Sequence, residues 1–248
     1  MTSFKDHFSR QASTYAKFRP DYPEELYAFI AGQCPSHHLA WDCGTGNGQA
    51  ALGLARHFDK VIATDPSSAQ IENATPHPKV EYRVGSAEHS NLPDASCDLI
   101  TVAQALHWFD HPAFFAEAKG VLKPGGLLAP WCYTLFRSNP AIDAVILEFY
   151  EGTIGPWWPA ERSHIDHAYE TIPFPDTPRQ HHEFTIHLEW DLDQMIGYLR
   201  SWSATQRYIK DQQSNPLPQV REELANIWGV PKTQHAIEIP IHLFLVSF

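Results

Sequence analysis

The 248-residue sequence predicts an α/β fold with a doubly wound, mostly parallel sheet. Short apolar runs, typical of buried parallel strands, alternate with segments that suit helices. A glycine-rich turn at residues 42–48 follows the first run, and an acid ends the second. Such turns belong at the carboxyl edge of the sheet, where open α/β folds bind ligands.

The elements are expected in a regular order. Strands are predicted at residues 39–41, 61–65, 97–103 and 127–133, and a possible third strand at 80–84. Helices are expected at 50–57 and at 111–122, the second ending at the Lys-Pro-Gly-Gly stretch 123–126. Later in the chain, residues 183–189 alternate as a strand does, Asp191 caps a helix running to 203, and 236–248 form the last strand. Pro240 predicts a bulge in that strand, or a strand that begins after it.

The glycine-rich turn has the pattern G-x-G-x-G, formed by Gly44, Gly46 and Gly48. A dinucleotide fingerprint would place its third glycine at Gln49, and a P-loop would need a lysine after Gly48. The acid before the first glycine, Asp42, suits a ligand that carries an ammonium group as well as a carboxylate, such as S-adenosylmethionine. Asp42 could act on the ammonium group or on loop amides, or it could simply close the loop.

A second acid stands at the end of the second predicted strand. Asp65 follows the run Val61-Ile62-Ala63-Thr64. An acid at this place can accept hydrogen bonds from both ribose hydroxyls of a nucleotide-like ligand. Asp65 could also cap a helix that begins near Ser67, and the two roles are compatible.

Four features in sequence order resemble the class I S-adenosylmethionine-dependent methyltransferases. They are D-C-G-T-G-N-G at 42–48, Asp65, G-S-A-E-H-S-N-L-P at 85–93 and L-K-P-G-G at 122–126. Three further segments, 15–23, 103–109 and 198–203, resemble the small-molecule branch that includes trans-aconitate methyltransferase-like enzymes. The resemblance is good over roughly residues 5–135. It implies a Rossmann-like sheet of seven strands with an antiparallel last strand, and S-adenosylmethionine as cofactor.

The resemblance also assigns a set of cofactor-binding residues. They are Tyr15, Arg19, Asp42, Gly44, Thr45, Gly46, Asp65, Pro66, Ala87, Glu88, Gln104 and Ala105. One position departs from the family pattern, which often has an aspartate before the alanine where this chain has Ser86. Adenine N6 would then depend on Glu88 or on a backbone carbonyl.

His107 is the candidate catalytic residue, because it follows the fourth predicted strand at the ligand-binding edge. It would face the methyl acceptor, unless it is a packed histidine. Trp108, Trp157 and Trp202 are candidates for the acceptor's walls. A hydroxyl acceptor would need His107 as a base, whereas a carboxylate needs none. Arg19, Arg200 or Arg207 could each hold a small acid.

Composition excludes several classes of partner. A net charge of −11, with 18 scattered lysines and arginines, argues against nucleic acid. No apolar stretch approaches the ~20 residues of a membrane helix, and the polar N-terminus does not resemble a secretion signal. The four cysteines form no C-x-x-C pair, so a reducing cytoplasm is expected. The 15 histidines show no recognised zinc spacing, and no metal is expected.

We expect one domain over residues 1–248, with an N-terminal arm and helix (1–37), a cofactor-binding half (38–137) and an aromatic, helical or irregular cap with the final strands (138–248). The proline-rich stretches 155–159 and 172–175 make part of that cap irregular. The predicted function is methyl transfer to a small organic molecule, with a carboxylic acid favoured as acceptor. The alternative is an inactive cofactor-binding or interaction module. Gln49 opposes a nucleotide-dependent dehydrogenase, and the sequence does not fix the oligomeric state.

Overall fold

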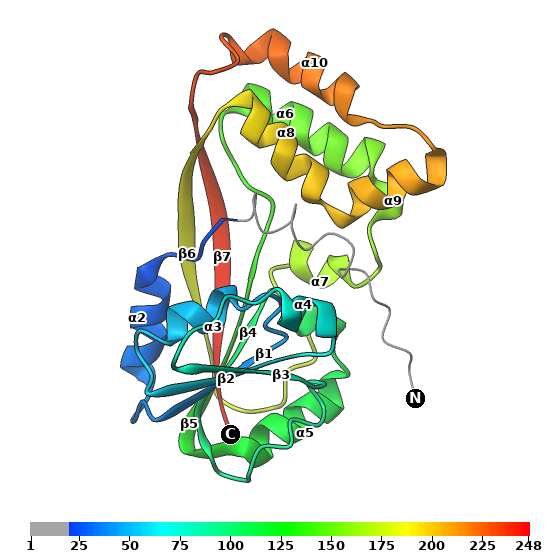
Figure 1. The fold of residues 1–248 in the computed structure, drawn as a ribbon. Helices are drawn as coiled ribbons and strands as arrows, with labels where there is room; N and C mark the ends of the chain where they lie inside the picture. The colour runs from blue at the N-terminus through cyan, green and yellow to red at the C-terminus, as the bar shows by residue number, and fades with distance from the viewer. Residues whose placement is uncertain (1–19) are drawn as a thin grey trace.

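The computed structural model describes residues 20–248, which form an α/β part and a helical cap (Figure 1). The α/β part contains, in chain order, α2 (Glu24–Gln33), β1 (Leu39–Cys43), α3 (Gln49–Leu54), β2 (Lys60–Asp65), α4 (Ser68–Glu72), β3 (Val80–Val84), β4 (Cys97–Ala103), the 3₁₀ turn η1 (Leu106–Trp108), α5 (His111–Val121) and β5 (Leu122–Tyr133). The remaining elements are α6 (Pro140–Leu147), η2 (Glu148–Thr153), η3 (Gly155–Trp157), α7 (Arg162–Asp166), β6 (Arg179–Trp190), α8 (Leu192–Ser201), α9 (Ser203–Gln212), α10 (Leu217–Trp228) and β7 (His235–Ser247). Tyr15 and Arg19 lie outside the described residues.

The seven strands form one sheet in the order β3-β2-β1-β4-β5-β7-β6. Strands β1 to β5 are parallel, and β7 pairs antiparallel with β5 on one side and β6 on the other. This arrangement confirms the predicted doubly wound sheet with an antiparallel last strand. Its order reverses between β1 and β4, so the helices that follow these two strands, α3 and α5, cover opposite faces of the sheet. Ligands bind in such folds at the carboxyl edge where the order reverses.

Both faces of the sheet are covered, which explains the apolar character of its central strands. In β1, Ala40 packs with α2 and α3 on one face, and its neighbour Trp41 packs with α5 on the other. Leu99 and Ile100 of β4 divide between the faces in the same way. Alternate residues are thus buried on opposite sides, as a two-sided parallel sheet requires.

A buried carboxylate joins the amino ends of the central strands, opposite the ligand-binding edge. Asp98, at the start of β4, accepts hydrogen bonds from the backbone N–H groups of His38 (2.8 Å) and Leu39 (2.9 Å), from Lys123 Nζ (2.7 Å) and from the Ser36 hydroxyl. Burial raises the pKa of Asp98, but these hydrogen bonds and the Lys123 charge outweigh it and lower the pKa to about 2. One ionised side chain therefore joins the beginnings of β1, β4 and β5.

The long strands β6 and β7 run side by side from the α/β part to the cap, where α10 packs against α6 and α8 (Figure 1). Asp191 and Gln194 form a capping box at the start of α8. The predicted helix from Asp191 to 203 is wrong in length, because Trp202 adopts an extended conformation (φ −67°, ψ 135°) and a new helix, α9, begins after it.

Two strand predictions are also corrected. Strand β5 begins at Leu122, which pairs with Cys97 of β4. The next pair is Leu127 with Leu99, so residues 123–126, which include the Pro-Gly-Gly stretch, form an irregularity within the strand. Strand β7 continues through Pro240, which pairs with Thr185 without a bulge. The Pro240 carbonyl accepts a hydrogen bond from the Thr134 N–H, so the backbone of Pro240 faces β5 and not β6. Strand β5 ends at Tyr133, so the N–H that proline lacks is not needed for pairing there.

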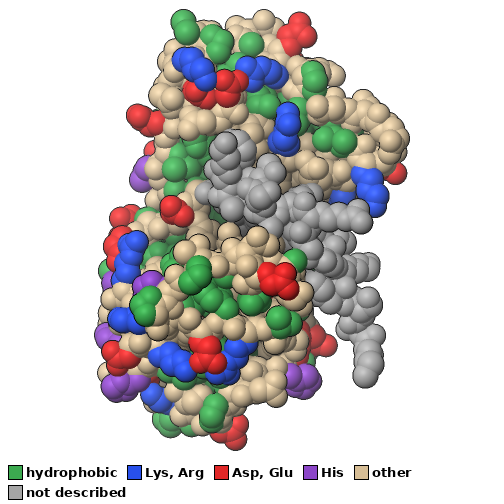
Figure 2. All heavy atoms as spheres, viewed as in Figure 1, with side chains coloured by type: hydrophobic (Ala, Val, Ile, Leu, Met, Phe, Trp, Pro, Cys, Tyr) green, Lys and Arg blue, Asp and Glu red, His purple; other side chains and the backbone are tan. Residues whose placement is uncertain are grey.

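In the described residues, no helix has the length and apolar character needed to cross a membrane. On the face shown in Figure 2, basic and acidic side chains are interspersed. That face therefore lacks the basic stripe typical of a nucleic-acid surface.

Candidate active site

One cavity of about 1800 Å³ lies at the carboxyl edge of the sheet, between the ends of the strands and the cap. It is lined by the loops after β1 (residues 44–47), β2 (65–67), β3 (86–89) and β4 (103–105 and 107–110), and by residues 133–135 after β5. The cap contributes residues 158–162 and 201–203, with Ile165, Tyr198 and Arg207. Its volume exceeds the roughly 300–1,000 Å³ of a site for one small ligand, so it has room for a cofactor and an acceptor together.

The glycines of the first loop have distinct roles. Gly44 (φ +71°) lies against the loop after β4, where an added Cβ would approach the Ala105 Cβ to 2.7 Å. Gly48 (φ +92°) lies under Tyr82, whose hydroxyl would be 2.3 Å from an added Cβ. At Gly46 (φ +57°), no atom of the described residues lies within 4 Å of an added Cβ. The outer glycines allow close packing, and the middle one leaves backbone open to the cavity.

Asp65 joins this loop to the end of β2. Its carboxylate accepts hydrogen bonds from the backbone N–H of Gly46 and from that of Ser67, both at 2.9 Å. Asp65, Pro66 and Ser67 all line the cavity. The carboxylate is therefore held at the cavity wall by both neighbouring turns.

Asp42 lies beneath the loop, is fully buried and does not itself line the cavity. Its two oxygens accept hydrogen bonds from the hydroxyls of Thr45 and Thr101, and the Ala51 N–H at the start of α3 also bonds to it. Burial raises the pKa of Asp42 to about 6, although those hydrogen bonds act to lower it; the Asp65 charge adds to the rise. In this geometry Asp42 fastens the loop from beneath, and its predicted action on the ammonium group of a cofactor stays a prediction.

The loop after β3 brings Ser86, Ala87 and Glu88 to the cavity. Glu88 reaches across it and accepts a hydrogen bond from the Asp110 backbone N–H at 3.2 Å, just before α5. Glu88 thus joins the loops after β3 and β4 as well as lining the space between them.

Gln104 lines the cavity in a left-handed conformation (φ +56°) that is uncommon for a residue with a side chain. Its side-chain amide pairs with the Tyr133 backbone, accepting from the Tyr133 N–H at 2.7 Å and donating to the Tyr133 carbonyl at 3.2 Å. The side chain therefore extends the pairing of β4 and β5 beyond the last strand residue. Ala105 follows, packed against Gly44.

His107 and Trp108 both line the cavity, and their rings pack together with centroids 4.7 Å apart. His107 is largely buried, and its Nδ1 lies 3.2 Å from the Tyr169 hydroxyl oxygen. Backbone N–H groups of Leu106 and His107 also face that oxygen, so the hydroxyl proton is directed at Nδ1. In neutral His107 the proton then resides on Nε2, and this nitrogen is a hydrogen-bond donor.

Aromatic side chains from the cap form the far wall. Trp158, Tyr198 and Trp202 line the cavity. The Trp202 ring lies between the other two, with ring centroids 5.8 Å from Trp158 and 5.7 Å from Tyr198. Trp157 does not join them: it packs on Tyr208, and its indole donates to Asp211. The structure thus puts Trp158 where the sequence analysis expected Trp157.

Arg162 is the cavity residue that the sequence analysis missed. Its guanidinium lies 4.7 Å above the Trp158 ring, and its Nε donates to the Tyr150 hydroxyl (2.8 Å) and to Asp166 (3.1 Å). Within residues 20–248, its two terminal nitrogens have no hydrogen-bond partner. The side chain is only 16% exposed, so a cation is held in an aromatic setting with its fork unused. Its one sequence signal was an arginine close to paired tryptophans.

Charge is divided across the cavity. The α/β part contributes Asp21, Asp65, Glu88 and Asp110 and no lining lysine or arginine among the described residues. The cap contributes Arg162 and Arg207 together with one acid, Glu161. Arg200 is exposed and outside the lining. An acidic wall disfavours a polyphosphate and suits a cofactor with sulfonium and ammonium charges. The residues present therefore fit S-adenosylmethionine on the loop side.

Comparison with known proteins agrees with this geometry. A family described as a methyltransferase domain matches residues 41–129. A protein of Dictyostelium discoideum named as a methyltransferase is 41% identical over 229 residues, which cover 90% of this chain and 86% of that protein. The solved structure of a type II methyltransferase from Anaeromyxobacter dehalogenans is 39% identical, with a TM-score of 0.87 over 93% of this chain and 98% of that one.

A more distant structure shares the fold at 15% identity and a TM-score of 0.52, covering 100% of this chain and 60% of that one. It is a phosphoethanolamine N-methyltransferase of Haemonchus contortus in complex with S-adenosylhomocysteine, the demethylated cofactor.

The buried Asp42 predicts a specific pH dependence of stability. Because its folded pKa of about 6 is above the ordinary value of 3.8, its ionisation disfavours folding progressively as pH rises from about 4 to 6. Asp42→Asn cannot ionise. Urea unfolding should therefore show the variant gaining up to about 3 kcal/mol relative to the parent protein between pH 4 and pH 7. Asp94→Asn, at an exposed position, is the control, and its free energy of unfolding should follow that of the parent protein at every pH. If the free energies of Asp42→Asn and of the parent changed in parallel with pH, the raised pKa of Asp42 would be contradicted.

Proposed function

Because the chain belongs to the class I S-adenosylmethionine-dependent methyltransferases, we propose that it methylates a small organic carboxylic acid on oxygen. The observation that carries this proposal is the single cavity with an acid-lined loop side and an arginine in the aromatic cap. A cytoplasmic location is part of the proposal, supported by four buried free cysteines.

On the loop side, the chain offers each part of the cofactor a suitable surface. Asp65 would accept the ribose hydroxyls, and the open backbone at Gly46 would approach the methionine portion. Ala87 and Glu88 would flank the adenine. Tyr15 and Arg19 remain predictions from the family resemblance.

When bound, S-adenosylmethionine supplies a methyl group on a positively charged sulfur, which an acceptor oxygen can displace in line. A carboxylate oxygen is already a nucleophile near neutral pH, so no protein group needs to remove a proton. What remains for the protein is to orient the acceptor and exclude water. Trp158, Tyr198 and Trp202 provide the apolar walls for this purpose.

Two donors favour a carboxylate over a hydroxyl acceptor. The unused fork of Arg162 matches a carboxylate in charge and shape, and its Nε contacts fix the guanidinium plane. His107, with its proton on Nε2, offers a hydrogen bond and not a base. Arg162 would hold one end of the acid, and His107 would help to position the reacting end. An inactive cofactor-binding module would explain neither the arginine nor its aromatic surroundings.

The direct test incubates the protein with methyl-labelled cofactor and a library of small carboxylic acids, each paired with its primary amide. The proposal predicts base-labile methyl esters from acids and no product from amides. Arg162→Gln should raise KM for the accepted acid about 10- to 150-fold, the equivalent of roughly 1.5–3 kcal/mol for a charged hydrogen bond, with cofactor affinity unchanged. The exposed Arg200→Gln is the matched control. Equal KM values for the two variants, or transfer to uncharged acceptors alone, would contradict an acid held by Arg162.

The role of His107 is tested by His107→Gln, which retains a donor of similar reach but cannot act as a base. If His107 only donates a hydrogen bond, kcat should fall by about tenfold or less. The pH–rate profile should then lack a limb near the ordinary histidine value of about 6.5. A loss of ~10²–10⁴-fold, with such a limb in the parent protein alone, would show that His107 is a general base and that the acceptor is a hydroxyl.

A further inference from the structure

Three potential metal ligands meet on the outer strands of the sheet. His181 and Glu183 alternate along β6 and so share one face, and Glu183 pairs in register with His242 of β7. His181 Nε2 lies 3.3 Å from His242 Nδ1, and His242 Nδ1 lies 3.7 Å from the Glu183 carboxylate. The three ligand atoms all lie within 4.8 Å of one another. None of the three residues lines the methyl-transfer cavity.

We propose that His181, Glu183 and His242 bind a divalent transition metal, with zinc as the best match. Zinc binds imidazole nitrogen and carboxylate oxygen at about 2.0–2.2 Å in tetrahedral geometry, which puts ligand atoms about 3.3–3.6 Å apart. The separations of His242 Nδ1 from His181 Nε2 (3.3 Å) and from the Glu183 carboxylate (3.7 Å) are close to this spacing. Two nitrogen ligands select zinc, nickel or copper over magnesium and calcium, which prefer oxygen.

The cluster is organised before any metal binds. The His181 ring stacks on Phe244 at 4.7 Å with an interplanar angle of 13°, and it also stacks on His242. These contacts fix the ring's orientation, so binding orders little that is not already ordered.

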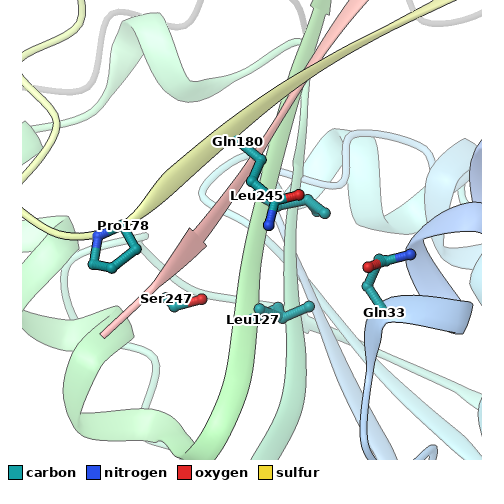
Figure 3. Close-up of a pocket in the computed structure, with 6 residues that line it drawn as sticks. All are labelled: Gln33, Leu127, Pro178, Gln180, Leu245 and Ser247. Atoms are coloured by element: carbon teal, nitrogen blue, oxygen red, sulfur yellow. The ribbon is translucent and has the colours of Figure 1, made fainter.

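Other hollows and histidines of the described residues do not offer this combination. A hollow of about 190 Å³ at the opposite end of the sheet is lined by Gln33, Leu127, Pro178, Gln180, Leu245 and Ser247 (Figure 3). It has no charged side chain among these residues. His111 and His164 are in edge contact at 5.6 Å, but no carboxylate or thiol joins them within ligand distance in the described part of the chain.

A bound metal would fasten β6 to β7, the two strands that run from the α/β part to the cap (Figure 1). Because the ligands come from both strands, the complete site exists only in the folded chain. Metal binding should therefore stabilise the folded state by mass action. The site is a cross-strand one, which explains why the spacing of histidines along the sequence did not reveal it.

The experiment uses the full chain with any affinity tag removed and with metal stripped by a chelator. Calorimetric titration with zinc chloride should show one ion per chain at micromolar affinity, and the melting temperature should rise with zinc concentration. Loss of a ligand in His181→Ala or His242→Ala should weaken binding more than about 100-fold, beyond the 10- to 100-fold typical of groups that only support a ligand. Circular dichroism of the variants without metal verifies that they fold.

His187→Ala is the matched control. His187 lies 3.8 Å from Glu238 in a cross-strand pair on the same two strands, and the described residues contain no third ligand there. This variant should bind zinc as the parent does. Absence of one-to-one binding by the parent, or equal weakening in His187→Ala and His242→Ala, would overturn the proposal in favour of scattered histidine binding. Cobalt(II) in place of zinc should give the intense visible absorption of four-coordinate geometry; weak six-coordinate bands would contradict the assigned ligand set.

Discussion

The buried carboxylate of Asp42 is the constraint on which the rest of the site depends. It connects the glycine-rich loop through Thr45, strand β4 through Thr101 and the start of α3 through the Ala51 N–H. With the loop held from beneath, Gly46 presents its backbone to the cavity and Gly44 packs against Ala105. The burial that makes this carboxylate costly to ionise is also what lets its few hydrogen bonds fix the loop so firmly.

From this fixed loop, the cavity acquires two chemically different halves. Acids at the ends of the strands face one side, and the cap supplies aromatic rings and Arg162 on the other. A cofactor with positive charge and an acceptor with negative charge would each find the half that complements it. The division also follows the architecture, since the sheet edge is common to the fold whereas the cap is an addition to it.

Sequence reasoning succeeded where local pattern and topology coincide. The strands β3 and β4 were predicted at their observed limits. Strand β4 is a buried, nearly continuous apolar run, as is typical of a central parallel strand, whereas β3 is a half-buried edge strand in which apolar and charged residues alternate. The cap was predicted less well. Its helices depend on long-range packing, as the break at Trp202 shows. Arg162, at the start of α7, gains its environment only when Tyr150 of η2 and Trp158 after η3 pack against it. The burial of Asp42 could not be predicted from the sequence either, because it depends on hydrogen bonds from the glycine-rich loop, β4 and α3.

The central claim, that the sheet edge holds S-adenosylmethionine with Asp65 on the ribose, is tested most directly by calorimetric titration of the parent protein and of Asp65→Ala. The account predicts micromolar binding of S-adenosylmethionine and of S-adenosylhomocysteine by the parent. It predicts an affinity about 10- to 150-fold weaker in the variant, because two hydrogen bonds to a charged acceptor are lost. The exposed Asp94→Ala should bind as the parent does. An unchanged dissociation constant for Asp65→Ala, or heat with NAD and none with S-adenosylmethionine, would contradict the account.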